Sequence, residues 1–387
     1  MQVLYLTYGG HSGVVKSLVG RMSAVCNTSF SVEDFAKGFS YRYDRVKVPR
    51  ISYVTWMNIL KAKRQFGKMW REAYTRTDYA FEIMSRRASW RYRTGQGFDV
   101  ALQSGVLFSP FLYGKGKPFA LGVLDNTYMI GFKGRRRPKT KMRLSEYFMQ
   151  SEKKVYQLAD AIFVMSNHVK SSLVEDYGIN PDKIVVTGIG PNVEPDAEFK
   201  PSEQKYSSGK IVMIATNFKM KGGQDVLRAF ESVRKHIPDA RLVIIGEHSI
   251  ASAGVEYRGF LAREEVKKEL EDANLLVMPS YIEAFGVPFV EAMAFWTPCI
   301  GSDVEAIPEI IENGGSGFIV RAGDIASLAS SMLEVLTSVQ RAREMGVCAR
   351  KIYEKRYRWS DVISKIDCVL RDLAHHGKGG SQGLRSR

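Results

Sequence analysis

The feature that most constrains the fold is a short apolar run that leads through a turn into a helix, within residues 274–296. The apolar residues 274–278 (NLLVM) predict a strand that is buried on both faces of a sheet. Pro288 suits the first turn of a helix, where its missing N–H is not needed, and the residues FVEAMAFW continue that helix. The segment therefore predicts a strand, a turn and a helix, the repeating unit of a parallel α/β sheet.

The turn in this segment favours the binding of an anion. Backbone N–H groups around Phe285, Gly286 and Val287 lie at the start of the predicted helix, with the positive end of its dipole behind them. Helix starts of this kind bind diphosphates. Glu283 lies just outside the turn at the carboxyl end of the strand, and Glu291 lies in the first turns of the helix. A carboxylate at the position of Glu291 can accept hydrogen bonds from both hydroxyls of a ribose.

The segment resembles the family 4 retaining glycosyltransferases, relatives of glycogen and sucrose synthases, in which two glutamates have seven residues between them. The resemblance rests on P-S-x-x-E-A-F-G at 279–286, E-A-M-A at 291–294, T-P at 297–298 and E-I-I-x-x-G-x-x-G-F-I-V at 309–320. It covers most of the second half of the chain and reaches residues 1–150 only in outline. It implies a GT-B fold: α/β, with two Rossmann-like doubly wound parallel-sheet domains that face each other across a cleft.

The rest of the chain repeats the alternation of strands and helices, and 387 residues suit two domains. In the first half the pattern predicts strands at 3–6, 98–102, 119–124, 160–165 and 184–187, with helices at 14–25, 144–158 and 167–176. In the second half it predicts strands at 211–216, 241–246 and 274–278, with helices at 224–236, 263–272, 288–296 and 324–337.

A segment with three prolines and many small polar residues, 191–209, is the predicted linker. We expect an N-terminal acceptor-binding domain at 1–195 and a C-terminal nucleotide-sugar donor-binding domain at 208–356. The resemblance implies that a crossing helix at about 357–376 completes the first domain. Residues 377–387 are expected to be a disordered tail.

Lys221 is the predicted cation of the donor site, because it precedes two glycines and a helix start at the carboxyl end of a strand. The alternative is a solvated loop lysine. The resemblance implies that Lys221 and the turn at 285–287 bind the diphosphate, that Glu291 binds the ribose, and that Glu283 lies beside the sugar as a catalytic residue. The family commonly has an arginine a few residues before this lysine. This chain has Asn217 and Lys219 there instead, and Lys219 is the candidate for the second positive charge.

In the first domain, Gly9, Gly10 and Gly13 form a turn between a strand and a helix and are candidates for contact with the donor's diphosphate. Such a turn is also a common way for the chain to leave a strand. His11, beside it, is an acceptor-side candidate. Asp125 follows a buried strand and has two readings, an Asx turn or a catalytic carboxylate near the sugar or acceptor hydroxyl.

One further departure from the family lies at Trp296. Relatives usually carry a glycine between E-A-M-A and T-P, where this chain has Phe295 and Trp296. The bulky side chain repacks the core behind the site, or it narrows the nucleotide pocket; the sequence leaves both open.

Composition excludes several classes of protein. No apolar stretch is long enough to cross a membrane, and the first residues lack the basic region of a signal peptide. The 4 cysteines and the histidines show no metal-ligand spacing, so we expect a cytoplasmic protein that needs no metal and no cofactor.

The net charge of +15 is unevenly placed. Residues 1–150 carry 26 Lys and Arg against 9 Asp and Glu, a balance of +17, whereas residues 151–387 carry 30 against 32. Basic residues are interleaved with aromatic ones at 61–93 and are clustered again at 133–143. Trp56, Phe66 and Trp70, in or just before the first of these regions, are candidates for interfacial anchors. This pattern favours peripheral binding to an anionic membrane on its inner face, and a solvated basic surface is the alternative.

The function expected is therefore a retaining, metal-independent glycosyltransferase. It would use a UDP- or GDP-sugar and a lipid-linked or saccharide acceptor, in the synthesis of glycolipid, polysaccharide or cell-envelope glycan. Two other classes stay open. One is a catalytically silent GT-B module that binds sugars or scaffolds partners. The other is a nucleic-acid binding protein, which the charge alone suggests; because the chain shows no recognised nucleic-acid binding motif and residues 274–320 are not basic, no nucleic-acid partner is expected. The sequence names neither the sugar, the base, the acceptor nor the oligomeric state.

Overall fold

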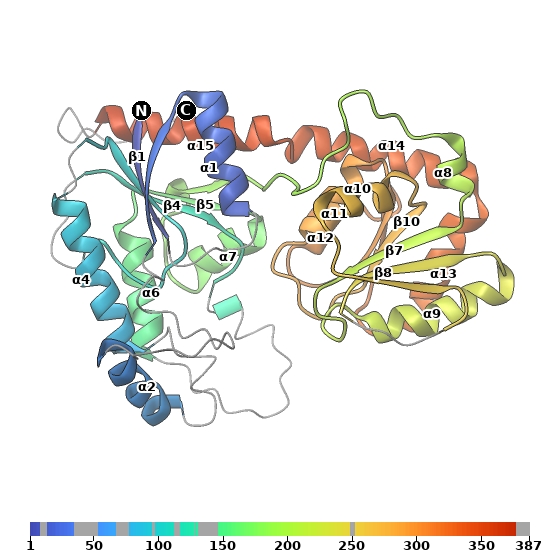
Figure 1. The fold of residues 1–387 in the computed structure, drawn as a ribbon, viewed down its shortest axis with the longest axis horizontal. Helices are drawn as coiled ribbons and strands as arrows, with labels where there is room; N and C mark the ends of the chain where they lie inside the picture. The colour runs from blue at the N-terminus through green and yellow to red at the C-terminus, as the bar shows by residue number, and fades with distance from the viewer. Residues whose placement is uncertain are drawn as a thin grey trace. The chain divides into compact units, whose positions relative to one another are not determined.

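The structure is a computed structural model that describes residues 1–7, 14–34, 53–66, 77–94, 97–111, 117–127, 129–130, 146–247 and 252–376. The chain forms two compact units (Figure 1). The first comprises Met1–Met165, Val169–Thr187 and Ile363–Arg387, and the second comprises Ser166–His168 and Gly188–Val362. Within the described ranges, every helix is too short or too polar to span a bilayer.

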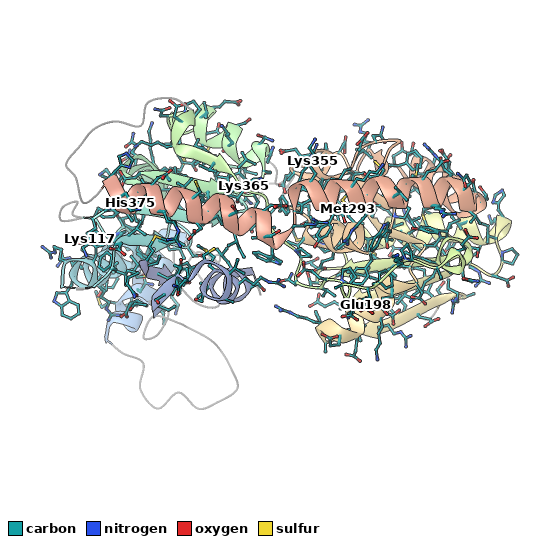
Figure 2. All side chains as sticks on the ribbon, turned by 90° about the horizontal axis from the view of Figure 1, so that it is seen from above. Lys117, Glu198, Met293, Lys355, Lys365 and His375 are labelled. Carbon is teal, nitrogen blue, oxygen red and sulfur yellow. The ribbon has the colours of Figure 1, made fainter. Side chains whose placement is uncertain are left out.

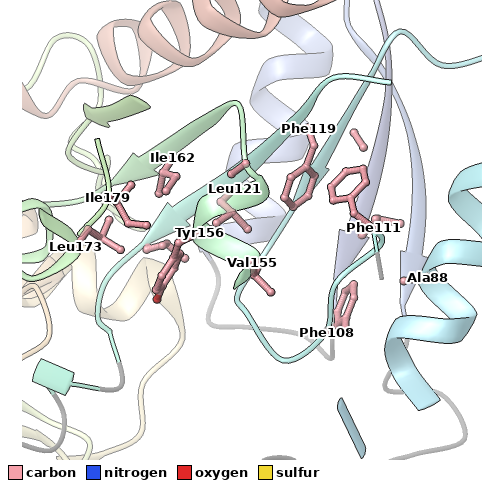
Figure 3. Packing of buried hydrophobic residues seen from close by; sticks show 14 of the residues in the cluster. Ala88, Phe108, Phe111, Phe119, Leu121, Val155, Tyr156, Ile162, Leu173 and Ile179 are labelled. Carbon is pink, nitrogen blue, oxygen red and sulfur yellow. The ribbon is translucent and has the colours of Figure 1, made fainter. Parts of the chain in front are cut away.

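The first unit is built on a parallel sheet of six strands in the order β2-β1-β3-β4-β5-β6. The strands are β1 (Gln2–Thr7), β2 (Ser29–Asp34), β3 (Val100–Gln103), β4 (Phe119–Leu124), β5 (Ala161–Val164) and β6 (Ile184–Val186). The helices are α1 (Val14–Cys26), α2 (Tyr53–Phe66), α4 (Asp78–Thr94), α6 (Glu146–Leu158) and α7 (Asn167–Glu175). Aromatic rings and branched side chains fill the core, where Phe119 packs against Phe111 and Leu121 lies beside Ile162 on the neighbouring strand (Figure 3).

The C-terminal helix α15 (Trp359–His376) contributes to both units, because its residues from Ile363 onward belong to the first. There the Thr28 hydroxyl donates to the Asp367 carboxylate at 3.2 Å, and the Arg371 guanidinium donates to the Cys26 carbonyl at 2.6 Å. The first unit is therefore assembled from the two ends of the chain.

The second unit has a parallel sheet in the order β12-β11-β10-β7-β8-β9. Its strands are β7 (Lys210–Ala215), β8 (Arg241–Gly246), β9 (Val255–Gly259), β10 (Leu275–Met278), β11 (Cys299–Ser302) and β12 (Gly317–Val320). Its helices are α8 (Glu203–Ser207), α9 (Gly223–His236), α10 (Arg263–Glu271), α11 (Val287–Ala294), α12 (Ile307–Ile310), α13 (Ile325–Thr337) and α14 (Val339–Arg356). Met293 of α11 is buried, whereas Glu198 and Lys355 are exposed on this unit (Figure 2).

The strand order of the second unit creates a switch point between β7 and β10. From β7 the chain moves outward to β8 and β9, and it then returns to add β10, β11 and β12 on the other side. Loops that leave two such neighbouring strands at their carboxyl ends open a crevice in which ligands bind. The predicted α/β class with two parallel sheets is confirmed.

Residues 191–209, the predicted linker, pack on the second unit. The Tyr353 hydroxyl donates to Glu194 at 2.9 Å, and the Trp359 indole N–H donates to the Pro191 carbonyl at 2.7 Å. Phe199 lies against Phe295 with ring centroids 5.6 Å apart. Residues 191–209 therefore belong to the second unit rather than to a linker between two separate units.

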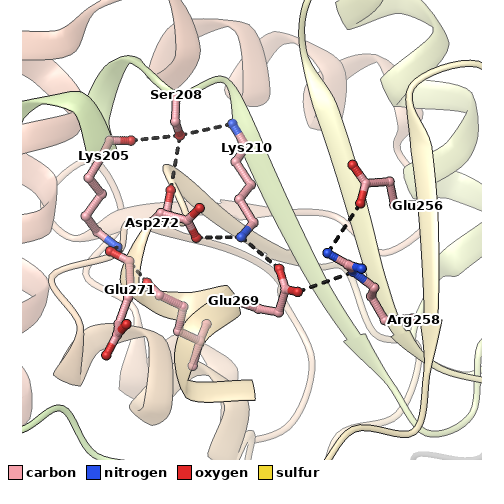
Figure 4. A network of polar contacts seen from close by, with 9 residues as sticks. Lys205, Ser208, Lys210, Glu256, Arg258, Glu269, Glu271 and Asp272 are labelled. Atoms are coloured by element: carbon pink, nitrogen blue, oxygen red, sulfur yellow. Dashed lines mark hydrogen bonds and ion pairs between the residues drawn. The ribbon is translucent and has the colours of Figure 1, made fainter. Parts of the chain in front are cut away.

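A charged network closes the amino end of the second sheet, opposite the switch-point loops (Figure 4). The Lys210 ammonium lies 2.5 Å from Asp272 and 2.7 Å from Glu269, and the Glu269 carboxylate also pairs with Arg258 at 3.3 Å. Among the residues that the structure describes, the neighbouring Lys205 forms no ion pair with a carboxylate. Its ammonium donates to the carbonyls of Leu270 at 2.7 Å and Glu271 at 3.2 Å, so it caps the end of α10.

This capping lysine predicts a pH-dependent stability. Burial lowers the pKa of Lys205 to about 7, from an ordinary value of 10.5. Between these values the unfolded chain binds more protons than the folded chain, so the free energy of unfolding rises with pH. We expect the wild type to gain roughly 3 kcal/mol over Lys205→Met between about pH 7 and 9.5 in urea unfolding. Lys200→Met, at an exposed lysine, should keep the wild-type slope, and equal slopes for all three proteins would contradict the prediction.

Candidate donor site

The candidate site lies at the switch point of the second unit, where the loop after β7 meets the loop after β10. The Tyr281 N–H donates to the Met220 carbonyl at 2.9 Å. Gly222 has a φ of +75°, and a Cβ there would lie 2.3 Å from the Pro279 carbonyl oxygen. The backbones of the two loops are thus in direct contact, and only glycine fits at this position.

Lys221 and Glu283 come together at this contact. The Lys221 ammonium lies 2.5 Å from Glu283 Oε2, and the Ser280 hydroxyl donates to the same oxygen at 3.3 Å. The Lys221 and Glu283 side chains are 18% and 8% exposed, so this ion pair is largely shielded from water. In such a pair the cation can neutralise the charge of a ligand's phosphate, and the carboxylate can face the ligand's sugar.

The two polar residues that precede Lys221 differ in their surroundings. Asn217 closes the turn, because its side-chain oxygen accepts the Met220 N–H at 3.0 Å and its carbonyl accepts the Lys221 N–H at 3.0 Å. Lys219 is exposed. Their contacts with a phosphate stay a prediction.

The helix start predicted from Pro288 is confirmed. Helix α11 begins at Val287, and Gly286 is its N-cap with a φ of +109°. Phe285 is buried, with its ring 6.0 Å from that of Tyr357. The turn at 285–287 therefore presents a helix N-terminus at the same edge of the sheet as Lys221 and Glu283, which follow β7 and β10.

Glu291 is a buried carboxyl with a partner that the sequence did not indicate. Its Oε1 accepts the backbone N–H of Asn192 at 3.1 Å and the side-chain amide of Asn192 at 3.2 Å. Burial raises the pKa of Glu291 to about 7, against the two Asn192 hydrogen bonds, which lower it. Within the described residues, the Asn192 side-chain oxygen is buried without a hydrogen-bond partner. Asn192 thus holds one oxygen of Glu291 and keeps an acceptor of its own.

Glu305 is a second residue that sequence reasoning missed. It follows β11, and its Oε2 accepts the backbone N–H of Glu283 at 2.8 Å. Burial raises the pKa of Glu305, whereas the hydrogen bond from Glu283 lowers it. A glutamate pattern alone could not single it out, since Glu305 has no regular spacing to Glu283 or Glu291.

Trp296 adopts a φ of +55°, in the region that favours glycine. Its ring stacks against the Arg350 guanidinium, whose carbon lies 4.1 Å from the ring centroid, and tilts against Phe199 at 5.9 Å. The Tyr206 hydroxyl donates to the Trp296 carbonyl at 3.3 Å. These contacts favour the first of the two readings, in which the tryptophan repacks the core behind the site.

The site residues predicted in the first half of the chain lie either outside the described residues or in the first unit. Gly9, Gly10, His11 and Gly13 lie outside the described residues. Asp125 is exposed and follows β4 directly, in the first unit. The loop after it is fixed by Tyr177, whose hydroxyl accepts the Met129 N–H at 3.3 Å. Among the described residues, no three His, Cys, Asp or Glu side chains come together as a metal site would require, and metal independence stays a prediction.

Comparison with known proteins gives this geometry a class. Residues 195–352 match the family model described as glycosyl transferases group 1. The chain is similar in structure to sucrose-phosphate synthase from Thermosynechococcus elongatus, with a TM-score of 0.67 and 16% identity over 96% of this chain and 99% of that one. The fold is the GT-B fold, as the resemblance implied. The group 1 model thus matches most of the second unit, which holds the candidate site.

Curated relatives agree with this class over part of their length. The chain is 30% identical over 184 residues to N-acetyl-alpha-D-glucosaminyl L-malate synthase of Bacillus anthracis, covering 45% of this chain and 48% of that protein. It is 27% identical over 253 residues to D-inositol 3-phosphate glycosyltransferase of Corynebacterium diphtheriae, covering 58% of each. The chain spans about half the length of these curated relatives.

Proposed function

We propose that this protein is a retaining, metal-independent glycosyltransferase that uses a nucleotide-sugar donor, with a UDP- or GDP-sugar as the expected class. The observation that carries the proposal is the buried Lys221–Glu283 pair beside the start of α11. The family match over residues 195–352 and the names of the two relatives, a glucosaminyl synthase and a glycosyltransferase, support the same activity. In this proposal the second unit binds the donor, and the first unit binds a lipid-linked or saccharide acceptor.

The chemistry follows from charge. Breaking a glycosyl–phosphate bond leaves negative charge on the diphosphate and positive character on the anomeric carbon. Lys221 and the N–H groups at 285–287 stabilise the first, and the Glu283 carboxylate stabilises the second. Glu291 accepts the ribose hydroxyls, and Lys219 and Asn217 lie in the loop that approaches the phosphates. Asp125, His11 and the glycines 9, 10 and 13 are the residues of the first half proposed to face the donor or the acceptor.

We also propose that the basic first half contacts an anionic membrane surface from the cytoplasm, in glycolipid or cell-envelope glycan synthesis. Helix α4 exposes Trp90 to 63% beside Arg86, whose side chain is 62% exposed, and such residues suit a lipid headgroup layer. The stretch 133–143 and the side chains of Trp56, Phe66 and Trp70 lie outside the described residues. Binding to anionic vesicles, lost at high salt, tests this part of the proposal.

The donor proposal is tested by a thermal-shift screen with UDP, GDP and ADP. A nucleotide at a hundredfold excess over its Kd adds about 2.7 kcal/mol, which raises the melting temperature by roughly 5 °C. Glu291→Gln keeps the shape and the Asn192 contacts and should lose most of this rise, whereas Glu198→Gln, at an exposed loop residue, should keep it. A nucleotide that stabilises the wild type and Glu291→Gln equally would contradict the assigned ribose contact. No rise with any nucleotide would favour the silent GT-B module instead.

The same site predicts a pH dependence. Only the ionised Glu291 accepts hydrogen bonds with both oxygens, and its pKa is raised to about 7. The affinity ratio of wild type to Glu291→Gln should therefore be constant above about pH 8 and fall up to about tenfold per pH unit below 7. The ratio removes the titration of the nucleotide itself, which both proteins share. A ratio that does not change with pH would contradict the role of the carboxylate.

A further inference from the structure

Glu305 holds a backbone conformation that a glutamate rarely adopts. Its φ is +48°, in the left-handed region where a side chain other than that of glycine is strained. Strain of this kind persists when the surrounding structure fixes the residue, and it gathers at functional sites. A functional role of the Glu305 side chain would account for this strained backbone.

Among the described residues, the Glu305 side chain makes its hydrogen bond to the backbone of Glu283. Glu305 Oε2 accepts the Glu283 N–H at 2.8 Å, although the two residues are 22 positions apart. Next to it, the Ser302 hydroxyl donates to the Ser280 carbonyl at 2.5 Å. The end of β11 and the turn after it thus hold the segment after β10 at two points, the Ser280 carbonyl and the Glu283 N–H.

The Glu305 carboxylate also interacts electrostatically with Lys221 and Glu283. Lys221 is bonded to Glu283 at 2.5 Å, and Glu305 lies close enough to both for their charges to act on it in opposite senses. A neutral acceptor could make the same hydrogen bond to the Glu283 N–H. The charge of a carboxylate at Glu305 also attracts the Lys221 ammonium.

We propose that Glu305 is a positioning residue that fixes the Glu283 backbone, and with it the direction of the Glu283 carboxylate toward the donor sugar. The inference rests on the proposed donor site for its catalytic consequence, but the hydrogen bond itself can be tested without any substrate. Glu305 acts through Glu283 and touches no reacting atom. The alternative is that the hydrogen bond from Glu283 to Glu305 contributes to stability alone, and the experiments below distinguish the two roles.

The first experiment measures hydrogen exchange in peptides that cover residues 280–286, for wild type, Glu305→Gly, Glu305→Gln and Glu198→Gln. Glycine adopts a φ of +48° without strain, so Glu305→Gly should melt no lower than the wild type. It should nevertheless exchange the Glu283 amide on the order of tenfold faster, because the acceptor is gone. Glu305→Gln keeps an acceptor oxygen and should exchange as the wild type does. Equal exchange in Glu305→Gly and wild type would overturn the inference.

The second experiment measures single-turnover hydrolysis of UDP-glucose and GDP-mannose by the same proteins, with the affinity for UDP and GDP alongside. Glu305→Gly should lose roughly tenfold to a hundredfold in turnover, because a small misplacement of a catalytic group is costly. Its affinity for UDP or GDP should change by less than about threefold, since the ribose and phosphate contacts remain. Faster exchange with unchanged turnover would reduce Glu305 to a structural staple and overturn the proposal. A wild type that neither binds nor turns over any nucleotide would instead refute the donor site, whatever the exchange shows.

Discussion

Lys221→Ala should lower sugar transfer by about 10³-fold or more. The Lys221 ammonium lies 2.5 Å from the Glu283 carboxylate, and the Glu283 side chain is 8% exposed. Its removal takes away the charge that neutralises the leaving diphosphate. It also leaves a buried carboxylate without a counter-ion, which costs about 3 kcal/mol of stability.

Three further variants separate these two effects. Lys221→Ala combined with Glu283→Gln should regain most of the stability, because the uncompensated charge is gone, but it should recover no turnover. Lys221→Arg keeps the charge with a different shape and should retain part of the activity. Lys219→Ala, at an exposed lysine of the same loop, should cost far less than Lys221→Ala. Similar losses at Lys219 and Lys221 would show that general basicity, rather than the buried pair, holds the donor.

Gly222→Ala should destabilise the second unit by about 2–4 kcal/mol and abolish nucleotide binding with it. A Cβ at Gly222 would lie 2.3 Å from the Pro279 carbonyl oxygen and 3.0 Å from the Pro279 carbonyl carbon, and backbone atoms cannot turn aside as a long side chain does. The loops after β7 and β10 would have to separate, and Lys221 would move away from Glu283.

Gly314→Ala is the matched control for this change. Gly314 has the same φ of +75°, but a Cβ there would meet nothing within 4 Å. The stability that Gly314→Ala loses therefore measures the cost of the left-handed backbone alone, about 1 kcal/mol. Urea unfolding of both variants gives the difference, which is the cost of the collision between the loops. Equal destabilisation of the two proteins would contradict the contact between Gly222 and Pro279.

Local signals predicted much of the second unit. The apolar run at 274–278, the turn and Pro288 are close together in sequence, and they fix β10 and α11 to within a residue or two. The rule that ligands bind at the carboxyl ends of parallel strands then brought Lys221 and Glu283 to one place, where the structure has them 2.5 Å apart. The same local reasoning missed four strands: β2 (SFSVED), β9 (VEYRG), β11 (CIGS) and β12 (GFIV). None of them has a continuous apolar run of four residues, the length that marks a buried strand.

Asn192 and Glu305 could not be found in this way. Asn192 lies in the stretch that reads as a linker, 99 residues from the glutamate it contacts. Glu305 lies in a polar turn after a strand that the sequence did not indicate, 22 residues from Glu283. Pairings of this length depend on how the strands are ordered in the sheet, and no local pattern of residue types encodes that order. The sequence shows Trp296 as a departure from the family pattern. Its stacking on Arg350 could not be predicted, because it depends on where α14 lies.

The two-ended assembly of the first unit sets an order of events during synthesis. Asp367 and Arg371, which bond Thr28 and Cys26, leave the ribosome only after the whole stretch 188–362 of the second unit. The second unit is therefore complete before the first can close, although most of the first is made earlier. Until then the surface of the first unit that α15 covers stays open to solvent, and this interval is when a nascent chain is most exposed to chaperones and to aggregation.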